Sequence, residues 1–386
     1  MKGEIDEILQ NAVDAGDVPG VVAIVVDADG VRYEGAAGER EIGTGDAMTV
    51  DTVGAIYSMT KAIVGVGAMA LVEEGRLDLD APAADVCPEL TDIQVLEGWD
   101  GDGEPRLRPP RTTITLRNLL THTSGFTYDL WNADTNRYIE QSGMASLRQG
   151  SREALLQPLA FDPGDRWEYG IGIDWVGRMI EAVVGDRLGA YLRERVFLPL
   201  GMLDTAFRSA PIDTDRAAAM HLRADDGSFT SVGRPRQEER EFDEGGGGLR
   251  GTMPDYARFL QMVLRGGELD GARILRPETI ELMAQNHIGD LRVGLLPTTN
   301  PQLSVDAEFF PGTPKTWGLT WQIDEHPQAT GRPAGTLMWA GLSNCFHWID
   351  RTNGIAGCFM SQVFPFADER ALGAFSDVEA AVYGAR

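Results

Sequence analysis

A serine and a lysine are spaced for joint chemistry in the segment Ser58-Met59-Thr60-Lys61. At the start of a helix, positions i and i+3 share a face, so the hydroxyl and the amine can meet. A serine hydroxyl is a weak nucleophile until a base takes its proton, and a buried lysine with a lowered pKa can be that base. The amides and dipole of the first helical turn also favour negative charge there. The spacing therefore indicates nucleophilic catalysis, with a capping serine beside a surface lysine as the alternative.

Lysine is rare in this chain, which gives Lys61 added weight. The chain has 34 basic residues, and the only lysines besides Lys61 are Lys2 and Lys315. Arginine keeps its proton in proteins, whereas lysine loses it when its surroundings lower its pKa. Lys61 is therefore a candidate general base.

The elements that must position this pair follow from hydrophobic periodicity. Residues 58–75 are mostly apolar and end at a glycine, which predicts a long buried helix. An amphipathic helix is expected at 3–15. Two β-branched runs, 20–26 and 31–38, predict a hairpin because the turn sequence DADG lies between them.

The remainder of the chain divides into a helical part and a second strand-rich part. Further helices are predicted at 113–126, 173–185, 187–201, 252–267, 276–285 and 368–383, and strands at 316–324, 335–341, 344–350 and 354–364. The stretch 97–111, rich in Gly, Pro and charge, is expected to be an exposed excursion. Strands at both ends predict a discontinuous sheet domain of residues 1–79 and 296–386. A mainly helical domain, 80–295, would be inserted in it, with the site in the cleft between the two.

The composition excludes several classes of protein. The chain has 386 residues, 43% of them hydrophobic, and a formal net charge of −25. Such an anionic surface repels nucleic acid and anionic membranes. No apolar run approaches the ~18 residues of a membrane helix, and the N-terminal residues lack the apolar core of a signal peptide. We expect a cytoplasmic protein whose partner is a small-molecule substrate, and the sequence leaves its oligomeric state open.

No residue pattern indicates a metal, a cofactor or a disulfide framework. The cysteines, Cys87, Cys345 and Cys358, are few and scattered, and the five histidines have no metal-ligand spacing. The chemistry expected of the chain therefore belongs to its own side chains.

Beyond the Ser-x-x-Lys tetrapeptide, five segments resemble the serine β-lactamase and penicillin-binding-protein superfamily. They are IYSMTKAIVGVGAMALVEEGRLDLDAP, LLTHTSGF, PGDRWEYGIGIDWVGRMIE, GGGGLRGTMPDYARFL and WAGLSNCFHWID. They occur in the family's order and cover most of the chain. Within the superfamily the chain is most similar to the family VIII carboxylesterases, which resemble class C β-lactamases. The resemblance implies an α/β (α+β) fold in which an antiparallel sheet is flanked by the terminal helices.

The resemblance also implies a role for Tyr169, in the segment Tyr169-Gly170-Ile171. This tyrosine would lie opposite Ser58. As a phenolate, or paired with Lys61, it would take the serine proton and later pass it to the leaving alkoxide. The alternative is a buried aromatic residue whose hydroxyl has a structural partner.

Trp339-Ala340-Gly341 corresponds to the strand that carries Lys-Thr-Gly in β-lactamases, and the esterases have Trp-x-Gly there. The resemblance assigns Trp339 and Gly341 to substrate binding, and the backbone amides of Ser58 and Leu342 to the oxyanion hole. Losing such a donor typically costs ~2.7–4 kcal/mol of transition-state stabilisation.

Two departures from the β-lactamase pattern favour esters over β-lactams. Ile171 replaces an asparagine and Trp339 replaces a lysine, so the polar groups that would hold a β-lactam are missing. Lys315-Thr316-Trp317 imitates Lys-Thr-Gly, but its third residue is bulky, and we expect Lys315 to lie on the surface.

Several residues near the matched segments are further candidates. Tyr128, Trp131 and Asp174 are assigned to the substrate pocket, with ordinary packing as an equally good account of each. His122 is expected to have a structural hydrogen-bonding role. The run Gly245–Gly248 is expected to form a turn near the cleft, because no Gly-Lys-Ser/Thr follows it.

Together these observations predict a serine carboxylesterase for short-chain or small aromatic acyl esters, acting through an acyl-enzyme on Ser58. Tryptophans expected near the site, Trp131, Trp339 and Trp348, would exclude water and admit an alcohol or amine, so acyl transfer is a second expected activity. The alternatives are a β-lactamase or D-amino-acid peptidase, and a non-catalytic binding protein that kept the fold.

Overall fold

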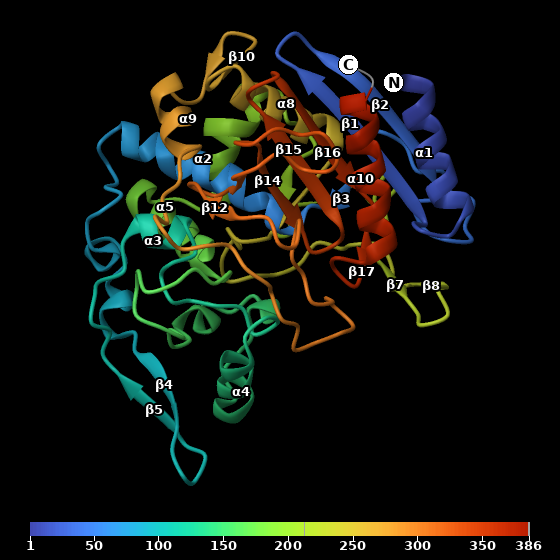
Figure 1. The fold of residues 1–386 in the computed structure, drawn as a ribbon. Coiled ribbons are helices and arrows are strands. Elements are labelled where there is room, and N and C mark those ends of the chain that lie inside the picture. The colour runs from blue at the N-terminus through green and yellow to red at the C-terminus, as the bar shows by residue number, and fades with distance from the viewer. Residues whose placement is uncertain (212, 385–386) are drawn as a thin grey trace.

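The computed structural model describes residues 1–211 and 213–384. Its centre is a seven-stranded sheet in the order β12-β13-β14-β15-β16-β1-β2, and every neighbouring pair is antiparallel (Figure 1). The strands are β1 (Gly20–Asp27), β2 (Val31–Gly38), β12 (Lys315–Trp317), β13 (Gln322–Asp324), β14 (Leu337–Gly341), β15 (Cys345–Asp350) and β16 (Ile355–Met360). Because β1 pairs with β16, the sheet joins the two ends of the chain.

Helices cover both faces of this sheet. On one face lie α1 (Lys2–Asp14) and α10 (Glu369–Gly384), side by side (Figure 1). On the other, α8 (Met253–Leu264) packs against β1 and β16, and α2 (Thr60–Glu73) belongs to the same core. Alternate residues of β1 enter the two cores, as the two-residue period of a strand requires. The predicted antiparallel sheet flanked by the terminal helices is confirmed.

The long segment between β2 and β12 holds both helices and small sheets. Its other helices are α3 (Leu116–Leu120), α4 (Ala133–Ser142), α5 (Gly172–Val184), α6 (Leu188–Leu192), α7 (Leu198–Leu200) and α9 (Pro277–Met283). The short strands are β3 (Gly54–Ala55), β4 (Val95–Trp99), β5 (Pro105–Arg108), β6 (Ala206–Phe207), β7 (His221–Arg223), β8 (Phe229–Ser231), β9 (Leu249–Gly251), β10 (Glu268–Leu269), β11 (Ala272–Arg273) and, after the main sheet, β17 (Val363–Phe364). The domain boundaries at 79/80 and 295/296 stay a prediction.

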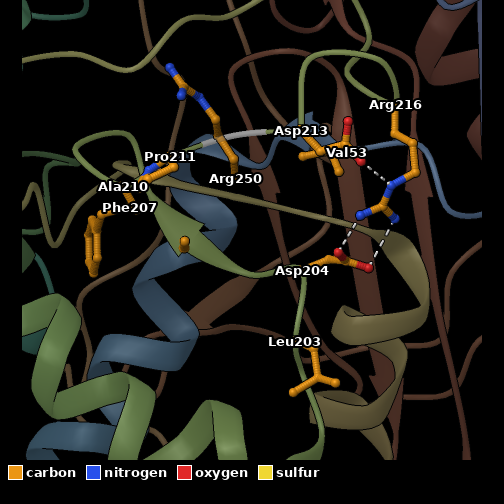
Figure 2. Close-up of a pocket in the computed structure, with 10 residues that line it drawn as sticks. Val53, Leu203, Asp204, Phe207, Ala210, Pro211, Asp213, Arg216 and Arg250 are labelled. Carbon is orange, nitrogen blue, oxygen red and sulfur yellow. Dashed lines mark hydrogen bonds and ion pairs between the residues drawn. The ribbon is translucent and has the colours of Figure 1, made fainter.

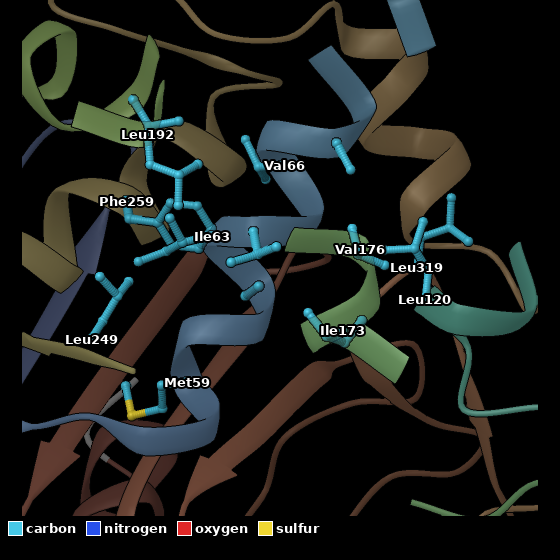
Figure 3. Close-up of a cluster of buried hydrophobic side chains, with 14 of the residues drawn as sticks. Met59, Ile63, Val66, Leu120, Ile173, Val176, Leu192, Leu249, Phe259 and Leu319 are labelled. Carbon is cyan, nitrogen blue, oxygen red and sulfur yellow. The ribbon is translucent and has the colours of Figure 1, made fainter. Parts of the chain in front are cut away.

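Helix α2 lies at the centre of the larger core. Its residues from Thr60 to Leu71 are all buried. Side chains from α5, α6 and α8 surround it, among them Val176, Leu192 and Phe259 (Figure 3). A helix that is apolar on all sides is stable only when it is covered on all sides. The predicted long buried helix is therefore confirmed, and its first turn is held in a fixed place.

Some predicted elements are shorter than expected. The helix predicted at 113–126 ends at Leu120, because the chain turns through a positive φ at His122 and at Gly125. The strand predicted at 316–324 is two strands, β12 and β13, joined by a tight turn in which Thr320 has φ +91°. The run 354–364 divides into β16 and β17. The expected exposed excursion at 97–111 is confirmed, and most of it is a protruding hairpin, β4–β5 (Figure 1).

The expected surface position of Lys315 is wrong. Its side chain is 1% exposed, and its Nζ donates to Glu308 at 2.8 Å and to the carbonyl oxygen of Phe310 at 3.2 Å. The loop before β12 turns back over the strand and supplies these acceptors, which is why an ammonium group can be buried there.

We predict that Ile63→Ala, at a fully buried position of α2, lowers the free energy of unfolding by roughly 2–5 kcal/mol because it leaves a cavity. Chemical denaturation monitored by circular dichroism measures this loss. The matched control is Ile42→Ala, whose side chain is 42% exposed. Equal effects of the two substitutions would contradict the central position of α2.

Candidate active site

Ser58 lies in a 3₁₀ turn, Tyr57–Met59, that runs directly into α2. Tyr57 adopts φ +42°, a conformation that bulky residues rarely take and that is found at functional sites. Two neighbours hold its ring: the Arg208 guanidinium lies over it at 4.8 Å, and Phe364 meets it edge-on. The backbone that presents Ser58 is therefore constrained on both sides, by Tyr57 and by α2.

The lysine amine is within reach of the serine hydroxyl. Lys61 is fully buried, and its Nζ donates to Ser58 Oγ at 3.1 Å, to Tyr128 Oη at 3.0 Å and to the carbonyl oxygen of Gly246 at 2.6 Å. An ammonium group has three N–H donors, and here each has an acceptor. The alternative of a surface lysine beside a capping serine is wrong for this pair.

Tyr169 is oriented by tryptophan rather than by lysine. Its hydroxyl accepts a hydrogen bond from Trp339 Nε1 at 2.9 Å, whereas the Lys61 amine lies over its ring, 4.7 Å from the centroid. Burial raises the pKa of Tyr169, and hydrogen bonds from Ser58 and Trp339 oppose that rise only in part. Tyr169 is therefore a neutral phenol at pH 7. The hydrogen-bonded tyrosine partner of Lys61 is Tyr128, whereas its amine contacts only the ring of Tyr169. The catalytic role of Tyr169 stays a prediction.

Burial and two nearby carboxyl groups act in opposite directions on the pKa of Lys61. Burial lowers the pKa of Lys61 to about 7, although the nearby charges of Asp174 and Glu244 act to raise it. Burial likewise raises the pKa of Asp174 to about 7, against the effect of Lys61. Asp174 Oδ1 accepts the backbone N–H of Gly246 at 2.9 Å, so the same carboxyl also holds the loop whose carbonyl meets Lys61.

Ser58 opens onto a cavity of about 330 Å³. One part of its wall is apolar, formed by Leu130, Trp131, Leu147, Leu303, Leu342 and Phe364. Another part is charged, formed by Asp129, Arg148, Arg208, Arg240 and Glu244. Tyr128 also lines this cavity. The volume suits a small ligand of mixed character.

Two glycines allow the close backbone approaches that build the site. A Cβ on Gly341 would lie 2.3 Å from the carbonyl oxygen of Ile56, so the end of β14 packs directly against the segment before Ser58. A Cβ on Gly246 would lie 2.4 Å from Asp174 Oδ2 and 2.8 Å from Tyr128 Oη. Side chains at either position would displace the groups around Ser58 and Lys61.

Four other residues singled out from the sequence lie outside the wall of the substrate cavity. Trp339 and Asp174 are buried behind Tyr169 and Gly246 and form no part of the cavity wall described above. His122 has the expected structural role, because its Nδ1 accepts the backbone N–H of Gly170. Trp348 does not lie near the site. It pairs with Met338 across β14 and β15, whereas Trp339 pairs with His347, so the two tryptophans point to opposite faces of the sheet. The Trp348 ring packs against Phe375 of α10.

Sequence reasoning missed the carbonyl of Gly246 as a lysine partner, and it missed Glu244. The run of four glycines at 245–248 was the available signal, since such a run permits a backbone carbonyl to approach a side chain closely. Among the described residues, no cluster of His, Cys, Asp and Glu side chains is able to hold a metal ion. No helix in the described ranges has the length and apolarity needed to span a membrane.

Comparison with known proteins defines the class. The Beta-lactamase family model matches residues 5–382. A lovastatin esterase from Penicillium rubens is 32% identical over 92% of this chain and 91% of its own length. The chain therefore belongs to the β-lactamase family, and its mixed α/β fold is β-lactamase-like, as the resemblance implied.

An acyl-transferring enzyme and a solved synthase structure are also similar to the chain. Monacolin J acid methylbutanoyltransferase from Aspergillus terreus is 29% identical over 94% of this chain and 91% of its own length. The unliganded structure of simvastatin synthase (LovD) from Aspergillus terreus superposes with a TM-score of 0.85, at 27% identity, and covers 99% of this chain and 97% of that one. The relatives thus include both an esterase and acyltransferases of one serine-hydrolase fold.

We predict that the Lys61 amine titrates near pH 7 and that Asp174→Asn moves this titration to lower pH. The Asp174 charge raises the pKa of Lys61, whereas burial lowers it. Removing that charge should therefore let burial lower the pKa further. With only three lysines in the chain, lysine labelled with ¹³C at Cε gives few NMR signals to follow.

The Lys61 signal is assigned by its loss in Lys61→Met. Asp129→Asn is the matched control. Asp129 also lines the cavity, but its charge does not contribute to the shifted pKa of Lys61. A shift to higher pH in Asp174→Asn, or equal shifts in the two variants, would contradict the assigned electrostatics.

Proposed function

We propose that the protein is a serine carboxylesterase that forms an acyl-enzyme on Ser58 and also transfers the acyl group to alcohols. The observation that carries this proposal is the 3.1 Å contact between Ser58 Oγ and a fully buried Lys61 Nζ at the edge of a ligand-sized cavity. Its family supports the hydrolase and acyltransferase chemistry, and the name of the Penicillium relative supports ester substrates.

In the first step, Lys61 acts as the general base. Burial lowers the pKa of Lys61 to about 7, so the neutral amine is accessible near neutral pH. A neutral amine has two N–H donors and one lone pair. The carbonyl oxygen of Gly246 can only accept, so it holds one N–H, and Tyr128 Oη can take the other. The lone pair is then left for the proton of Ser58.

Ser58 Oγ attacks the ester carbonyl, and the backbone amides of Ser58 and Leu342 are assigned to the oxyanion. Both residues line the same cavity. Lys61 then returns the proton that it took from Ser58 to the leaving alkoxide, while the Tyr169 phenol, held by Trp339, donates a hydrogen bond to that oxygen. The proton lost by Ser58 thus ends on the departing alcohol, while Ser58 keeps the acyl group. Water or a second alcohol then attacks the acyl-enzyme, with Lys61 again taking the proton.

Small neutral acyl groups suit the apolar wall of the cavity. Trp339 donates to Tyr169, and Ile171 is an aliphatic residue where β-lactamases have an asparagine. Neither side chain offers a charged or amide group to a β-lactam. The proposal also includes three finer points. The protein resembles the family VIII carboxylesterases, its substrates are short-chain or small aromatic acyl esters, and its location is cytoplasmic.

We predict that p-nitrophenyl acetate and butyrate give a burst of p-nitrophenol and an acyl adduct, both lost in Ser58→Ala. Loss of the nucleophile should lower kcat by about 10³-fold or more, as in other serine hydrolases. Stopped-flow absorbance and intact-mass spectrometry measure the two signals. Equal slow hydrolysis in both proteins would exclude Ser58 as the nucleophile and favour a non-catalytic binding protein.

A chromogenic cephalosporin tests the other alternative under the same conditions. Cephalosporin turnover close to ester turnover would favour a β-lactamase or D-amino-acid peptidase and overturn the preference for esters. Slow or absent cephalosporin turnover beside fast ester turnover is the expected result.

We predict that added butanol diverts part of the acyl-enzyme to a butyl ester, because the apolar wall receives an alcohol acceptor. Gas chromatography of the products measures the ratio of new ester to free acid. The similarity to acyltransferases supports this activity. Pure hydrolysis at a saturating alcohol concentration would contradict acyl transfer while leaving the esterase proposal intact.

A further inference from the structure

A second cavity, of about 280 Å³, shares Tyr57 and Arg208 with the substrate cavity. Three further arginines, Arg234, Arg236 and Arg250, line it, and Glu238 contributes a carboxylate. We call it the arginine cavity. It does not include Ser58, Lys61 or the apolar wall of the substrate cavity.

Arg250 is the buried group of this cavity, with an exposed fraction of 4%. Its Nη2 donates to the carbonyl oxygen of Arg236 at 2.6 Å and to Glu238 at 3.1 Å, but its Nε and Nη1 have no acceptor. Figure 2 shows its guanidinium pointing away from Asp204, which pairs with Arg216 instead. Unmatched buried donors are costly, so an acceptor from outside the chain would stabilise this arrangement.

The nearby carboxylates do not neutralise the arginines. Glu238 is shared between Arg240 and Arg250. Arg208 reaches Glu244 only at 3.8 Å, and Arg236 forms no ion pair with any residue that the structure describes. The chain as a whole carries a net charge of −25, so this excess of positive charge is a local reversal.

Arg234, by contrast, is paired with Glu41 and Asp46. Burial and the charge of Arg208 lower the pKa of Arg250 to about 10, as expected where positive groups crowd together. Arg236 thus has no carboxylate partner among the described residues, and Arg208 shares its one partner, Glu244, with Arg240.

We propose that the arginine cavity binds a phosphate-type oxyanion, either free phosphate or the phosphate group of a small monoester. A planar guanidinium offers paired N–H donors that match two oxygens of such an anion. A bound phosphate would accept hydrogen bonds from the unmatched Nε and Nη1 of Arg250 and offset the unpaired charge of Arg236. The bound anion would lie against Tyr57 and Arg208, next to the nucleophile, but its binding requires no acyl chemistry.

The test is isothermal titration calorimetry of the full chain with inorganic phosphate, in a chloride buffer of constant ionic strength. One site with Kd below about 1 mM is expected. Arg236→Gln should weaken binding by at least about tenfold, because it removes a charge-assisted partner. Arg292→Gln is the matched control: Arg292 is exposed, and its side chain contacts only backbone carbonyls.

Arg250→Gln should abolish phosphate binding, and its circular dichroism spectrum reports whether this variant folds. If the Arg250→Gln variant does not fold, Arg236→Gln decides the proposal. Ser58→Ala should bind phosphate as the parent does, which separates this site from the proposed esterase. Glycerol 3-phosphate in a second titration distinguishes a monoester ligand from free phosphate by tighter binding.

Absence of phosphate binding to the parent would overturn the proposal. Equal losses in Arg236→Gln and Arg292→Gln would overturn it as well, since they would indicate general charge attraction. A loss in Arg148→Gln with none in Arg236→Gln would assign the anion to the substrate cavity instead.

Discussion

The burial of one amine, that of Lys61, is the constraint on which the rest of the site depends. An isolated ammonium group is costly to bury, so the protein must either neutralise it or surround it with acceptors. Here both occur: burial lowers the pKa of Lys61 to about 7, and three oxygens lie at its Nζ. A more exposed lysine would stay charged at neutral pH and have no lone pair for Ser58.

This burial requires a rigid surrounding, and the fold supplies it through α2. The helix is apolar on all sides, and α5, α6 and α8 cover it (Figure 3). Its start faces the end of β14, where Gly341 allows direct contact with the backbone before Ser58. Strands from the two ends of the chain meet in one sheet, so residues near positions 58 and 340 become neighbours.

The protonation of the site residues depends on burial and on nearby charges that act against each other. Asp174 and Glu244 favour the protonated lysine, and burial opposes them. The phenol of Tyr169 is kept neutral by burial while Trp339 fixes its orientation. On the far side of Tyr57, the arginines lack enough carboxylates, in a chain that is acidic as a whole. The net charge of the protein therefore does not predict the charge or the protonation of the groups at this site.

The sequence by itself determined the class of fold, the helix that begins just after Ser58 and carries Lys61, and the sheet shared by both chain ends. These depend on local periodicity and on short spacings, such as the i, i+3 relation that brings Ser58 and Lys61 together. Lys315 shows the limit: its burial depends on Glu308 and Phe310 in a loop that turns back over β12, and no local pattern reveals that turn.

Only the tertiary structure decided that Tyr128 and the carbonyl of Gly246, rather than Tyr169, are the partners of Lys61. It also decided that Trp339 acts on Tyr169 from behind and that Trp348 belongs to the opposite face of the sheet. Those contacts join residues between 67 and 185 positions apart for Lys61, and 170 positions apart for Trp339. The physical reason is that side-chain partners at such separations are fixed by how the layers pack, which periodicity along the chain does not encode.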